Sequence, residues 1–228
     1  MEIGESRLYL CTDARTRQAD FAQFVDAAFA GGVDVIQLRD ASLEAADELE
    51  ALVVLAETAE RHGKLWAVNN RADIAATSHA PVLHLGQRDL SRAAARSVIH
   101  PTTAIGLSTH SRAQVDAALA DDLLDYYCVG PVWATPTKPG RDAVGLELVE
   151  YAASREVIPE RDRPWFAIGG IDLSTVSHVV DSGARRIVVV RAITEASDPA
   201  DAAQRLCAAL PTPERAVATN SSPSCVSE

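Results

Sequence analysis

The chain has 228 residues, of which 47% are apolar, so it is long enough to bury one sizeable core without disulfide or metal staples. Its formal charge of −11 and its pI of about 5.0 argue against nucleic-acid and anionic-membrane surfaces, which need clustered positive charge. We therefore expect no nucleic-acid or membrane partner, and any anionic ligand must be held by a local group of basic side chains.

The N-terminus and the cysteines indicate the compartment. Residues 1–6 lack the basic region and the long apolar run of a signal peptide, and no apolar span reaches membrane length. Cys11, Cys128, Cys207 and Cys225 are far apart and lack zinc-ligand spacing. Three of them fall in apolar segments, and we interpret these as small core residues in a reducing compartment. A cytoplasmic protein is expected.

Short β-branched runs alternate with longer stretches of helical spacing, and the alternation repeats eight times between Arg7 and Leu210. The run Ile187–Val190 is apolar without alternation, as burial on both faces of a parallel sheet requires. The predicted fold is a single-domain α/β (β/α)8 TIM barrel over residues 1–210, followed by a disordered tail at 211–228. The expected strands are Leu8–Thr12, Val33–Arg39, Leu65–Asn69, Val82–Gly86, Ala104–Leu107, Tyr126–Gly130, Trp165–Gly169 and Arg186–Val190.

A doubly wound open sheet is the alternative fold. Such sheets carry a glycine fingerprint after the first strand when they bind dinucleotides. Residues 11–15 of this chain, Cys-Thr-Asp-Ala-Arg, lack that fingerprint, so a dinucleotide site is not supported.

Two helices near the N-terminus have clear local signals. The first is expected to open at Asp20, with Gln23 completing a capping box, and to end at Gly31 and Gly32. The second is expected from about Leu43 to His62, with Ser42 as N-cap and Gly63 as its stop. Its predicted apolar face is Leu49, Leu52, Val53 and Ala56.

The stretch from Asp125 to Arg141 begins as an apolar strand and becomes a loop with two threonines and a lysine. Its prolines and glycines prevent regular structure, while Thr135, Thr137 and Lys138 offer hydroxyls and a cation to an anion. Lys64 and Lys138 are the only lysines in the sequence, so the general composition of the chain does not account for a lysine at position 138. A rigid surface turn is the alternative interpretation.

Polar residues or glycines follow seven successive predicted strands. In a barrel these positions meet at the face that carries the active site. Backbone N–H groups at Gly169, Gly170 and after Val190 could hold a phosphate, although a glycine hinge in a tight turn would show the same pattern. The strand exits are Gln37 with Arg39, residues 69–71, 86–89, 108–110, 135–138, 169–171, and Val190 with Arg191.

Several exit residues have two interpretations. Arg39 and Lys138 would suit a second, more highly charged group, or would be solvated surface cations. Asp89 could bind Mg²⁺ beside phosphates, or cap the helix that starts near Ser91. His110 could transfer protons, or simply satisfy backbone groups. His84, inside an apolar strand, is interpreted as a core or barrel-lining residue.

The strand exits, taken together and in order, resemble those of the bacterial thiamine-phosphate synthase family. The resemblance covers Arg7 to about Leu210. The segments that carry it are Gln37–Arg39, Asn69, Leu83–Leu90, Gly106–His110, Val129–Pro131 with Thr135–Lys138, and Ala167–Ile171.

The resemblance implies a phosphate-dependent (β/α)8 transferase of thiamine biosynthesis. A pyrimidine diphosphate loses pyrophosphate with the help of Mg²⁺, and the ring nitrogen of a thiazole phosphate attacks the resulting pyrimidine-methyl cation. By this resemblance Gln37, Arg39, Asn69, Ser108 and Lys138 would hold the pyrimidine diphosphate, with Ser108, Lys138 and Arg39 as the catalytic groups. Thr135, Thr137, Gly169, Gly170, Val190 and Arg191 would hold the thiazole phosphate, and Asp89 with Asn70 the metal.

Two positions depart from the family's usual pattern. Ala41 stands where a lysine is usual, and Asn70 stands where an aspartate is usual. An amide oxygen can still bind Mg²⁺ but without charge, so weaker metal binding is expected. A missing ammonium near a departing diphosphate would cost on the order of 2–4 kcal/mol of transition-state stabilisation.

Two other functions fit the same residues. A thiazole tautomerase paralogue would keep the phosphate site and use a histidine such as His110, but it would need neither Lys138 nor Asp89. A barrel without catalysis could bind a thiazole phosphate or thiamine phosphate as a sensor, which Ala41 and Asn70 would favour. The expected partners are small phosphorylated substrates, and a homo-oligomer is compatible with the sequence.

Overall fold

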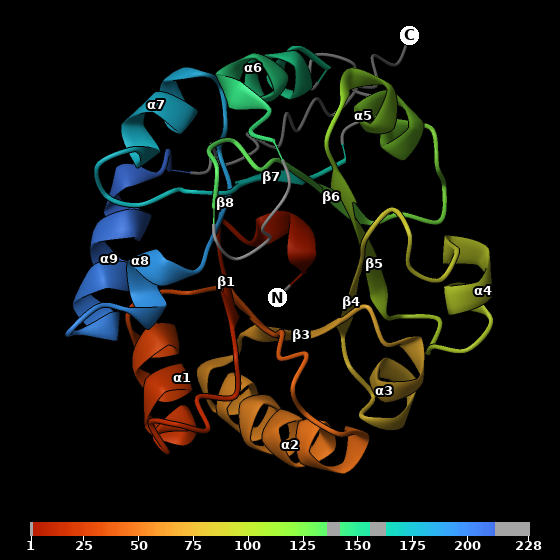
Figure 1. Cartoon of the computed structure of the whole chain (residues 1–228), viewed down its shortest axis with the longest axis vertical. Helices are drawn as coiled ribbons and strands as arrows, with labels where there is room; N and C mark the ends of the chain where they lie inside the picture. The colour runs from red at the N-terminus through yellow and green to blue at the C-terminus, as the bar shows by residue number, and fades with distance from the viewer. Residues whose placement is uncertain (1, 136–141, 156–162, 213–228) are drawn as a thin grey trace, which may run out of the picture.

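The computed structural model describes residues 2–135, 142–155 and 163–212, and shows eight parallel strands closed into a barrel (Figure 1). The strands follow one another around the barrel in chain order, and β1 closes it by pairing with β8. The predicted (β/α)8 fold is confirmed. The strands are β1 Leu8–Thr12, β2 Val35–Leu38, β3 Leu65–Asn69, β4 Val82–Leu85, β5 Ala104–Thr109, β6 Tyr126–Val129, β7 Trp165–Ile168 and β8 Ile187–Val189.

The α-helices lie around the outside of this barrel, whereas the short turn η1 (Ile3–Glu5) lies at its centre in the view of Figure 1. Most strands are followed by a helix that returns the chain to the start of the next strand, as parallel pairing requires. The helices are η1 Ile3–Glu5, α1 Phe21–Ala30, α2 Ala45–His62, α3 Ala72–Thr77, α4 Arg92–Arg96, α5 Arg112–Leu119, α6 Gly145–Arg155, α7 Val176–Asp181, α8 Arg191–Thr194 and α9 Pro199–Ala209.

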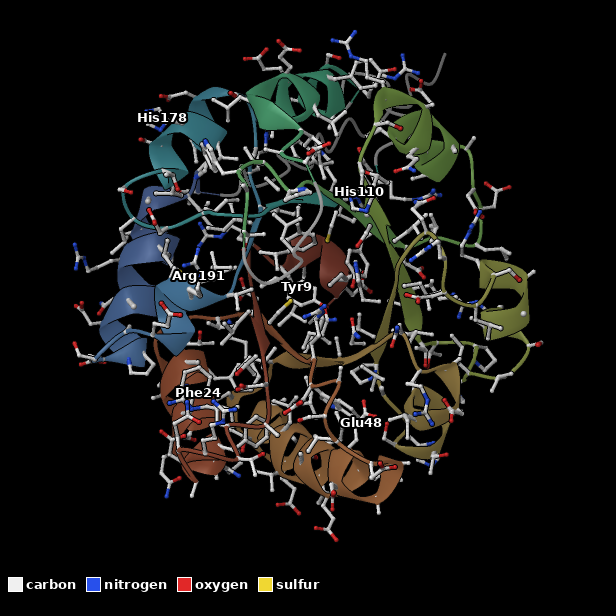
Figure 2. The ribbon with its side chains drawn as sticks, viewed as in Figure 1. Tyr9, Phe24, Glu48, His110, His178 and Arg191 are labelled. Atoms are coloured by element: carbon white, nitrogen blue, oxygen red, sulfur yellow. The ribbon has the colours of Figure 1, made fainter. Side chains whose placement is uncertain are left out.

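The strands separate two apolar layers because successive side chains point to opposite faces. In β1, Leu8 and Leu10 belong to the larger layer between strands and helices, whereas Tyr9 and Cys11 belong to the layer inside the barrel. Figure 2 shows Tyr9 near the middle of the ring of strands. The inner layer comprises Tyr9, Cys11, Val35, Ala67, Val82, Tyr126, Cys128, Phe166 and Val188.

The N-terminal turn η1 closes one end of the barrel. Ile3 packs against the inner layer, and the Arg186 guanidinium donates a hydrogen bond to the Gly4 carbonyl (3.0 Å). In Figure 1 this turn lies at the centre of the view down the barrel. A ligand can therefore approach the interior from the opposite end, where the strands finish.

Two helix starts differ from the prediction because the side chains expected to cap them form hydrogen bonds or ion pairs with other residues. Asp20 precedes α1 without capping it, since its carboxylate pairs with Arg15 (2.6 Å). Helix α2 begins at Ala45 after Glu44, because the Ser42 hydroxyl donates to Asp40 (2.6 Å) and stays in the preceding loop. Both predicted helix ends are confirmed, at Gly31 and at Gly63.

The buried face of α2 is rotated from the predicted one. Val53 is 57% exposed, whereas Leu55 and Ala59 are fully buried beside Leu52. The predicted face placed both Leu52 and Val53 against the core. Consecutive residues on a helix point about 100° apart, so both cannot lie in a narrow buried stripe.

Some predictions concern residues outside the described ranges. These are Thr137, Lys138 and all but the first two residues of the expected tail at 211–228. In the described part of the chain, no helix has the length and apolar character needed to cross a membrane.

Candidate active site

The inner faces of the strands change from apolar to polar toward their carboxyl ends. On β2, Val35 and Gln37 point the same way, and the same alternation pairs Ala67 with Asn69 on β3. Arg39 lies one residue past the strand and two residues after Gln37, so the same alternation directs it to this end. The strand register therefore gathers these side chains at one end of the barrel.

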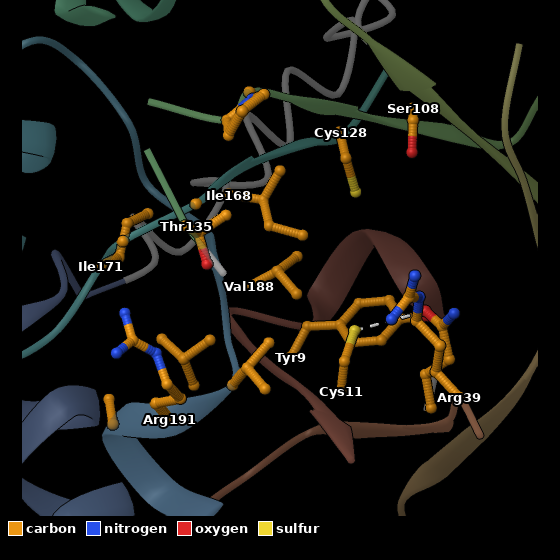
Figure 3. Close-up of a pocket in the computed structure, with 18 of the residues that line it drawn as sticks. Tyr9, Cys11, Arg39, Ser108, Cys128, Thr135, Ile168, Ile171, Val188 and Arg191 are labelled. Atoms are coloured by element: carbon orange, nitrogen blue, oxygen red, sulfur yellow. Dashed lines mark hydrogen bonds between the residues drawn. The ribbon is translucent and has the colours of Figure 1, made fainter. Parts of the chain in front are cut away.

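A cavity of about 240 Å³ opens at this end. Figure 3 shows Arg39 and Ser108 on one side of it and Thr135, Ile171 and Arg191 on the other. The wall between the two polar sides is mostly apolar. It includes Tyr9, Cys11, Cys128, Ile168 and Val188.

A hydrogen-bonded group of side chains forms the first side of the cavity. The Gln37 amide Nε2 donates to Asn69 Oδ1 (2.9 Å), and the Tyr9 hydroxyl donates to Gln37 Oε1 (3.0 Å). The Tyr9 and Tyr126 hydroxyls are 3.2 Å apart. Burial raises the pKa of both tyrosines well above the usual value for a phenol, so both stay protonated.

His84 joins Ser108 to this group. Its Nε2 lies 2.9 Å from the Ser108 hydroxyl, and its Nδ1 lies 3.0 Å from the Tyr126 hydroxyl. The prediction that His84 lines the barrel is confirmed. Tyr9 and Tyr126 were not predicted as site residues. Their neighbours Leu8 and Tyr127 face the helices, but the sequence alone does not show which of two alternating residues faces the inside of the barrel.

Asn70 and Asp89 lie together in an adjoining open cleft that also borders Asn69 and Ser108. Asn70 Nδ2 donates to Asp89 Oδ1 (3.1 Å), and the Gly86 N–H donates to Asp89 Oδ2 (2.6 Å). The interpretation of Asp89 as a helix cap is wrong, because Ser91 caps α4 by accepting from the Ala94 N–H.

These two side chains fit a magnesium ion. Asp89 offers a carboxylate and Asn70 an amide oxygen, the kinds of oxygen ligand that Mg²⁺ accepts, and the two side chains are in contact (3.1 Å from Asn70 Nδ2 to Asp89 Oδ1). Asn70 has a left-handed backbone (φ 51°), which Asn and Asp tolerate better than other side chains. No cluster of three or more His, Cys, Asp or Glu occurs in the described ranges, and phosphate oxygens and water are the ligands that commonly complete such a Mg²⁺ site.

Two arginines provide positive charge at the two sides of the cavity. Arg39 borders the cavity and both clefts beside it, and Arg191 starts α8 directly after Val190. Neither guanidinium forms an ion pair with the described acidic side chains. Both are therefore available to an anionic ligand.

The glycine pair after β7 is required by backbone packing. Gly169 (φ 108°) and Gly170 (φ 68°) adopt left-handed conformations, and a Cβ at Gly169 would lie 2.5 Å from Pro131. The Trp133 N–H donates to the Gly169 carbonyl (3.1 Å). The hinge interpretation is thus confirmed, and it places the loop after β6, with Thr135, against the exit of β7 beside the cavity.

His110 lies at the cavity wall, with its Nδ1 hydrogen-bonded to the Gly130 carbonyl. Its backbone N–H donates to Gln114 Oε1 (2.7 Å). The prediction that His110 satisfies a backbone group is confirmed, and the geometry adds nothing in favour of a proton-transfer role. Ala41 is exposed in the loop after β2.

The fold and the cavity together define a class of protein: a TIM-barrel enzyme that handles small anionic molecules at the carboxyl ends of its strands. Comparison with known proteins gives the particular family. The family model for thiamine monophosphate synthase matches residues 8–193.

Similar proteins agree with this match. The thiamine-phosphate synthase of Arthrobacter sp. (strain FB24) is 61% identical, over 91% of this chain and 95% of the relative. That of Streptomyces avermitilis is 56% identical, over 89% and 92%. The solved thiamine phosphate pyrophosphorylase from Pyrococcus furiosus aligns with a TM-score of 0.79 and 26% identity, over 90% of this chain and 96% of that one.

The chain belongs to the thiamine monophosphate synthase family. It functions as a transferase of thiamine biosynthesis that makes thiamine phosphate. The resemblance stated from the strand exits is confirmed.

Proposed function

We propose that the two polar sides of the cavity bind the two halves of thiamine: a pyrimidine diphosphate at the Gln37 side and a thiazole phosphate at the Thr135 side. The observation that carries this assignment is the apolar wall between two polar groups that each include one arginine without a described acidic partner. Two flat heterocycles with anionic tails need such a cavity, because each tail requires its own cation and the rings require an apolar surface between them.

On the pyrimidine side, amide and hydroxyl groups hold the ring and cations hold the diphosphate. Gln37, Asn69 and Ser108 offer both donors and acceptors to ring nitrogens and an amino group. Arg39 lines the cavity together with this group, and Lys138, outside the described ranges, is predicted to add an ammonium.

Magnesium is proposed at Asn70 and Asp89. When bound, it would neutralise charge on the leaving pyrophosphate. The carboxylate of Asp89 supplies the single negative ligand. Asn70 can supply its amide oxygen if the side-chain amide rotates by about 180°, which exchanges Oδ1 and Nδ2. The position of the cleft beside Arg39 and Ser108 supports this assignment.

On the thiazole side, Thr135 and Arg191 would hold the phosphate. Both border the cavity, and Figure 3 shows their polar ends on the same side. Val190 and the glycines 169 and 170 border the same region and can offer backbone N–H groups. Thr137, outside the described ranges, is predicted to take part.

The chemistry requires charge stabilisation and positioning. The bond between the pyrimidine methylene carbon and the diphosphate oxygen breaks, and its electron pair leaves with pyrophosphate. The thiazole ring nitrogen then donates its lone pair to the pyrimidine-methyl cation. Arg39, Lys138 and the Ser108 hydroxyl stabilise the departing charge, and the apolar wall keeps water from the cation. No group has to remove a proton from carbon, so a strong base is unnecessary.

The test is to incubate the chain with both substrates while varying Mg²⁺. Thiamine phosphate and pyrophosphate should form in equal amounts, and absence of product at every Mg²⁺ concentration would contradict the proposal. Arg39→Gln should lower kcat about 10²–10³-fold, the range for removing one stabilising donor. Arg17→Gln is the matched control, since Arg17 is an exposed arginine on the loop after β1. An equal loss of kcat in both variants would show that Arg39 has no specific role in the site.

A further inference from the structure

Seven hydrogen bonds join the reacting side of the cavity to the proposed metal site. They form one unbroken path from Ser108 to Asp89, which we name the polar chain. Its members in order are Ser108, His84, Tyr126, Tyr9, Gln37, Asn69, Asn70 and Asp89, with separations of 2.9, 3.0, 3.2, 3.0, 2.9, 3.3 and 3.1 Å.

The carboxylate at one end sets the direction of every bond. Asp89 can only accept, so Asn70 must present its Nδ2 to it, which leaves Asn70 Oδ1 to accept from Asn69. Asn69 Oδ1 then accepts from Gln37 Nε2. The Cys11 thiol is compatible with this orientation, because it can donate to Gln37 Oε1 (3.5 Å).

The same direction continues through the barrel interior to the cavity. Gln37 Oε1 accepts from Tyr9, so the Tyr9 oxygen accepts from Tyr126, and the Tyr126 oxygen accepts from His84 Nδ1–H. A neutral His84 protonated at Nδ1 has a bare Nε2, which accepts from the Ser108 hydroxyl. Ser108 therefore offers only acceptor lone pairs to the cavity.

A metal ion at Asn70 would reverse this direction. A cation requires the Asn70 oxygen, so the amide must turn and present its Nδ2 to Asn69. Asn69 and Gln37 must then turn as well, because two N–H groups cannot face each other. Each tyrosine hydroxyl rotates, and Nδ1 of His84 becomes an acceptor while Nε2 becomes the donor to Ser108.

We propose that Mg²⁺ at Asn70 and Asp89 reverses the polar chain, and so converts the Ser108 hydroxyl from an acceptor into a donor toward the substrate's diphosphate. The inference rests on the metal site and the diphosphate position proposed above. No proton is gained or lost overall: His84 loses the proton at Nδ1 and takes one at Nε2, by exchange with water at the cavity. The donor at Ser108 is thus present only when the metal is in place.

Asn70 is essential to this coupling. An aspartate at position 70 would accept from Asn69 whether or not a metal is bound, so the direction of the chain would stay fixed. The asparagine that replaces the usual carboxylate therefore makes His84 responsive to the metal, at the cost of one ligand charge. His84, Tyr126 and Tyr9 act as positioning residues, since they influence the substrate through Ser108.

Nitrogen NMR of the full chain labelled at its histidines tests the inference. At about pH 8, where an ordinary imidazole is neutral, the spectrum shows which nitrogen of His84 carries the proton. The His84 signals are identified by their loss in His84→Gln. We expect protonation at Nδ1 without metal and at Nε2 with Mg²⁺ and inorganic pyrophosphate.

Two variants isolate the cause. Asn70→Asp should bind Mg²⁺ and keep His84 protonated at Nδ1 throughout. Tyr126→Phe keeps the ring but removes the oxygen that links His84 to Tyr9, so its His84 should no longer respond to Mg²⁺. If Mg²⁺ moves the His84 proton from Nδ1 to Nε2 in either variant, the inference is overturned.

Calorimetry distinguishes the ways in which the inference can fail. If Mg²⁺ with pyrophosphate binds and His84 stays protonated at Nδ1, the reversal is wrong. If neither binds, both the reversal and the metal assignment are wrong. The assay for thiamine phosphate decides the proposed function separately in both cases.

Discussion

At the scale of single residues, Ala41 and Asn70 are the two positions at which we expect this barrel to differ from its family pattern. Ala41 is exposed two residues after Arg39, and Asn70 contacts Asp89. Restoring lysine at position 41 should raise kcat at least about tenfold, because one donor at a departing group is worth about 2.7–4 kcal/mol when well placed. Asn70→Asp should tighten Mg²⁺ binding by about tenfold, since it adds a charged ligand.

Steady-state kinetics with Mg²⁺ titration measures both changes, and the double variant shows whether they add. The effects belong to different groups, so the gain in kcat should appear in Ala41→Lys. Asn70→Asp should lower the Mg²⁺ requirement without raising kcat, because it keeps the Ser108 hydroxyl an acceptor. Unchanged kinetics in all three variants would mean that neighbouring groups already replace the missing charges.

Gly106 controls the position of Tyr126. A Cβ at Gly106 would lie 2.0 Å from the Tyr126 ring, which is far closer than atoms can approach. Gly106→Ala should therefore destabilise the fold by about 1–3 kcal/mol, the usual range for overpacking, and displace the tyrosine hydroxyl. Urea unfolding measures the first effect. Gly4→Ala, whose Cβ would meet nothing closer than 4.0 Å, is the control and should change stability little.

The sequence predicted which residues meet at the site better than how they are connected. Gln37, Asn69 and Ser108 were expected together because the carboxyl ends of parallel strands converge. Tyr9 and Tyr126 were missed because an apolar strand run does not reveal which alternate residues face inward. The hydrogen bond from Asn70 to Asp89 depends on a left-handed residue after β3, and no pattern in the sequence predicts that geometry.

At the scale of elements, Asp34 joins the starts of three strands at the closed end of the barrel. Its carboxylate accepts from the N–H groups of Arg7, just before β1, and of Leu8, at the start of β1 (2.8 and 3.1 Å), and from Lys64 Nζ before β3 (2.6 Å). The carboxylate is largely shielded, at 13% exposure. Asp34→Asn should cost about 2–4 kcal/mol, because one amide oxygen and one amide NH₂ cannot replace these acceptors.

Asp73→Asn is the matched control for Asp34→Asn. Arg71 lowers the pKa of Asp73 to about 2, yet this pair is exposed to solvent, and screening keeps its contribution below about 1 kcal/mol. Urea unfolding of the two variants should therefore differ clearly. Equal losses would show that Asp34 is no more important than a surface carboxylate.

Element boundaries were predicted to within a few residues, and the deviations have local causes. β2 starts at Val35 because the Val33 N–H still bonds to the Ala28 carbonyl at the end of α1. Helix α2 begins later than predicted because the Ser42 hydroxyl donates a hydrogen bond to Asp40. Side chains that can bond in two directions decide such boundaries, and a sequence does not show which bond is made.

At the scale of the whole molecule, two buried phenols inside the barrel connect folding to pH. Burial raises the pKa of Tyr9 and Tyr126 well above its usual value, so the folded chain keeps both protons in alkali. The unfolded chain releases them above about pH 10, the ordinary value for tyrosine. The folded state then binds more protons than the unfolded state, and the free energy of unfolding falls as the pH rises.

Stability should thus be fully present below about pH 10 and should decline above it, by about 1.4 kcal/mol per pH unit for each buried phenol. Tyr126→Phe loses the hydrogen bonds to Tyr9 and His84 and should be less stable at neutral pH. Above about pH 10, however, its free energy of unfolding should fall less steeply than that of the unmodified chain, by about 1.4 kcal/mol per pH unit. Urea unfolding across this range gives both slopes. Parallel slopes would mean that the Tyr126 phenol ionises inside the folded barrel, which its burial and its two hydrogen bonds oppose.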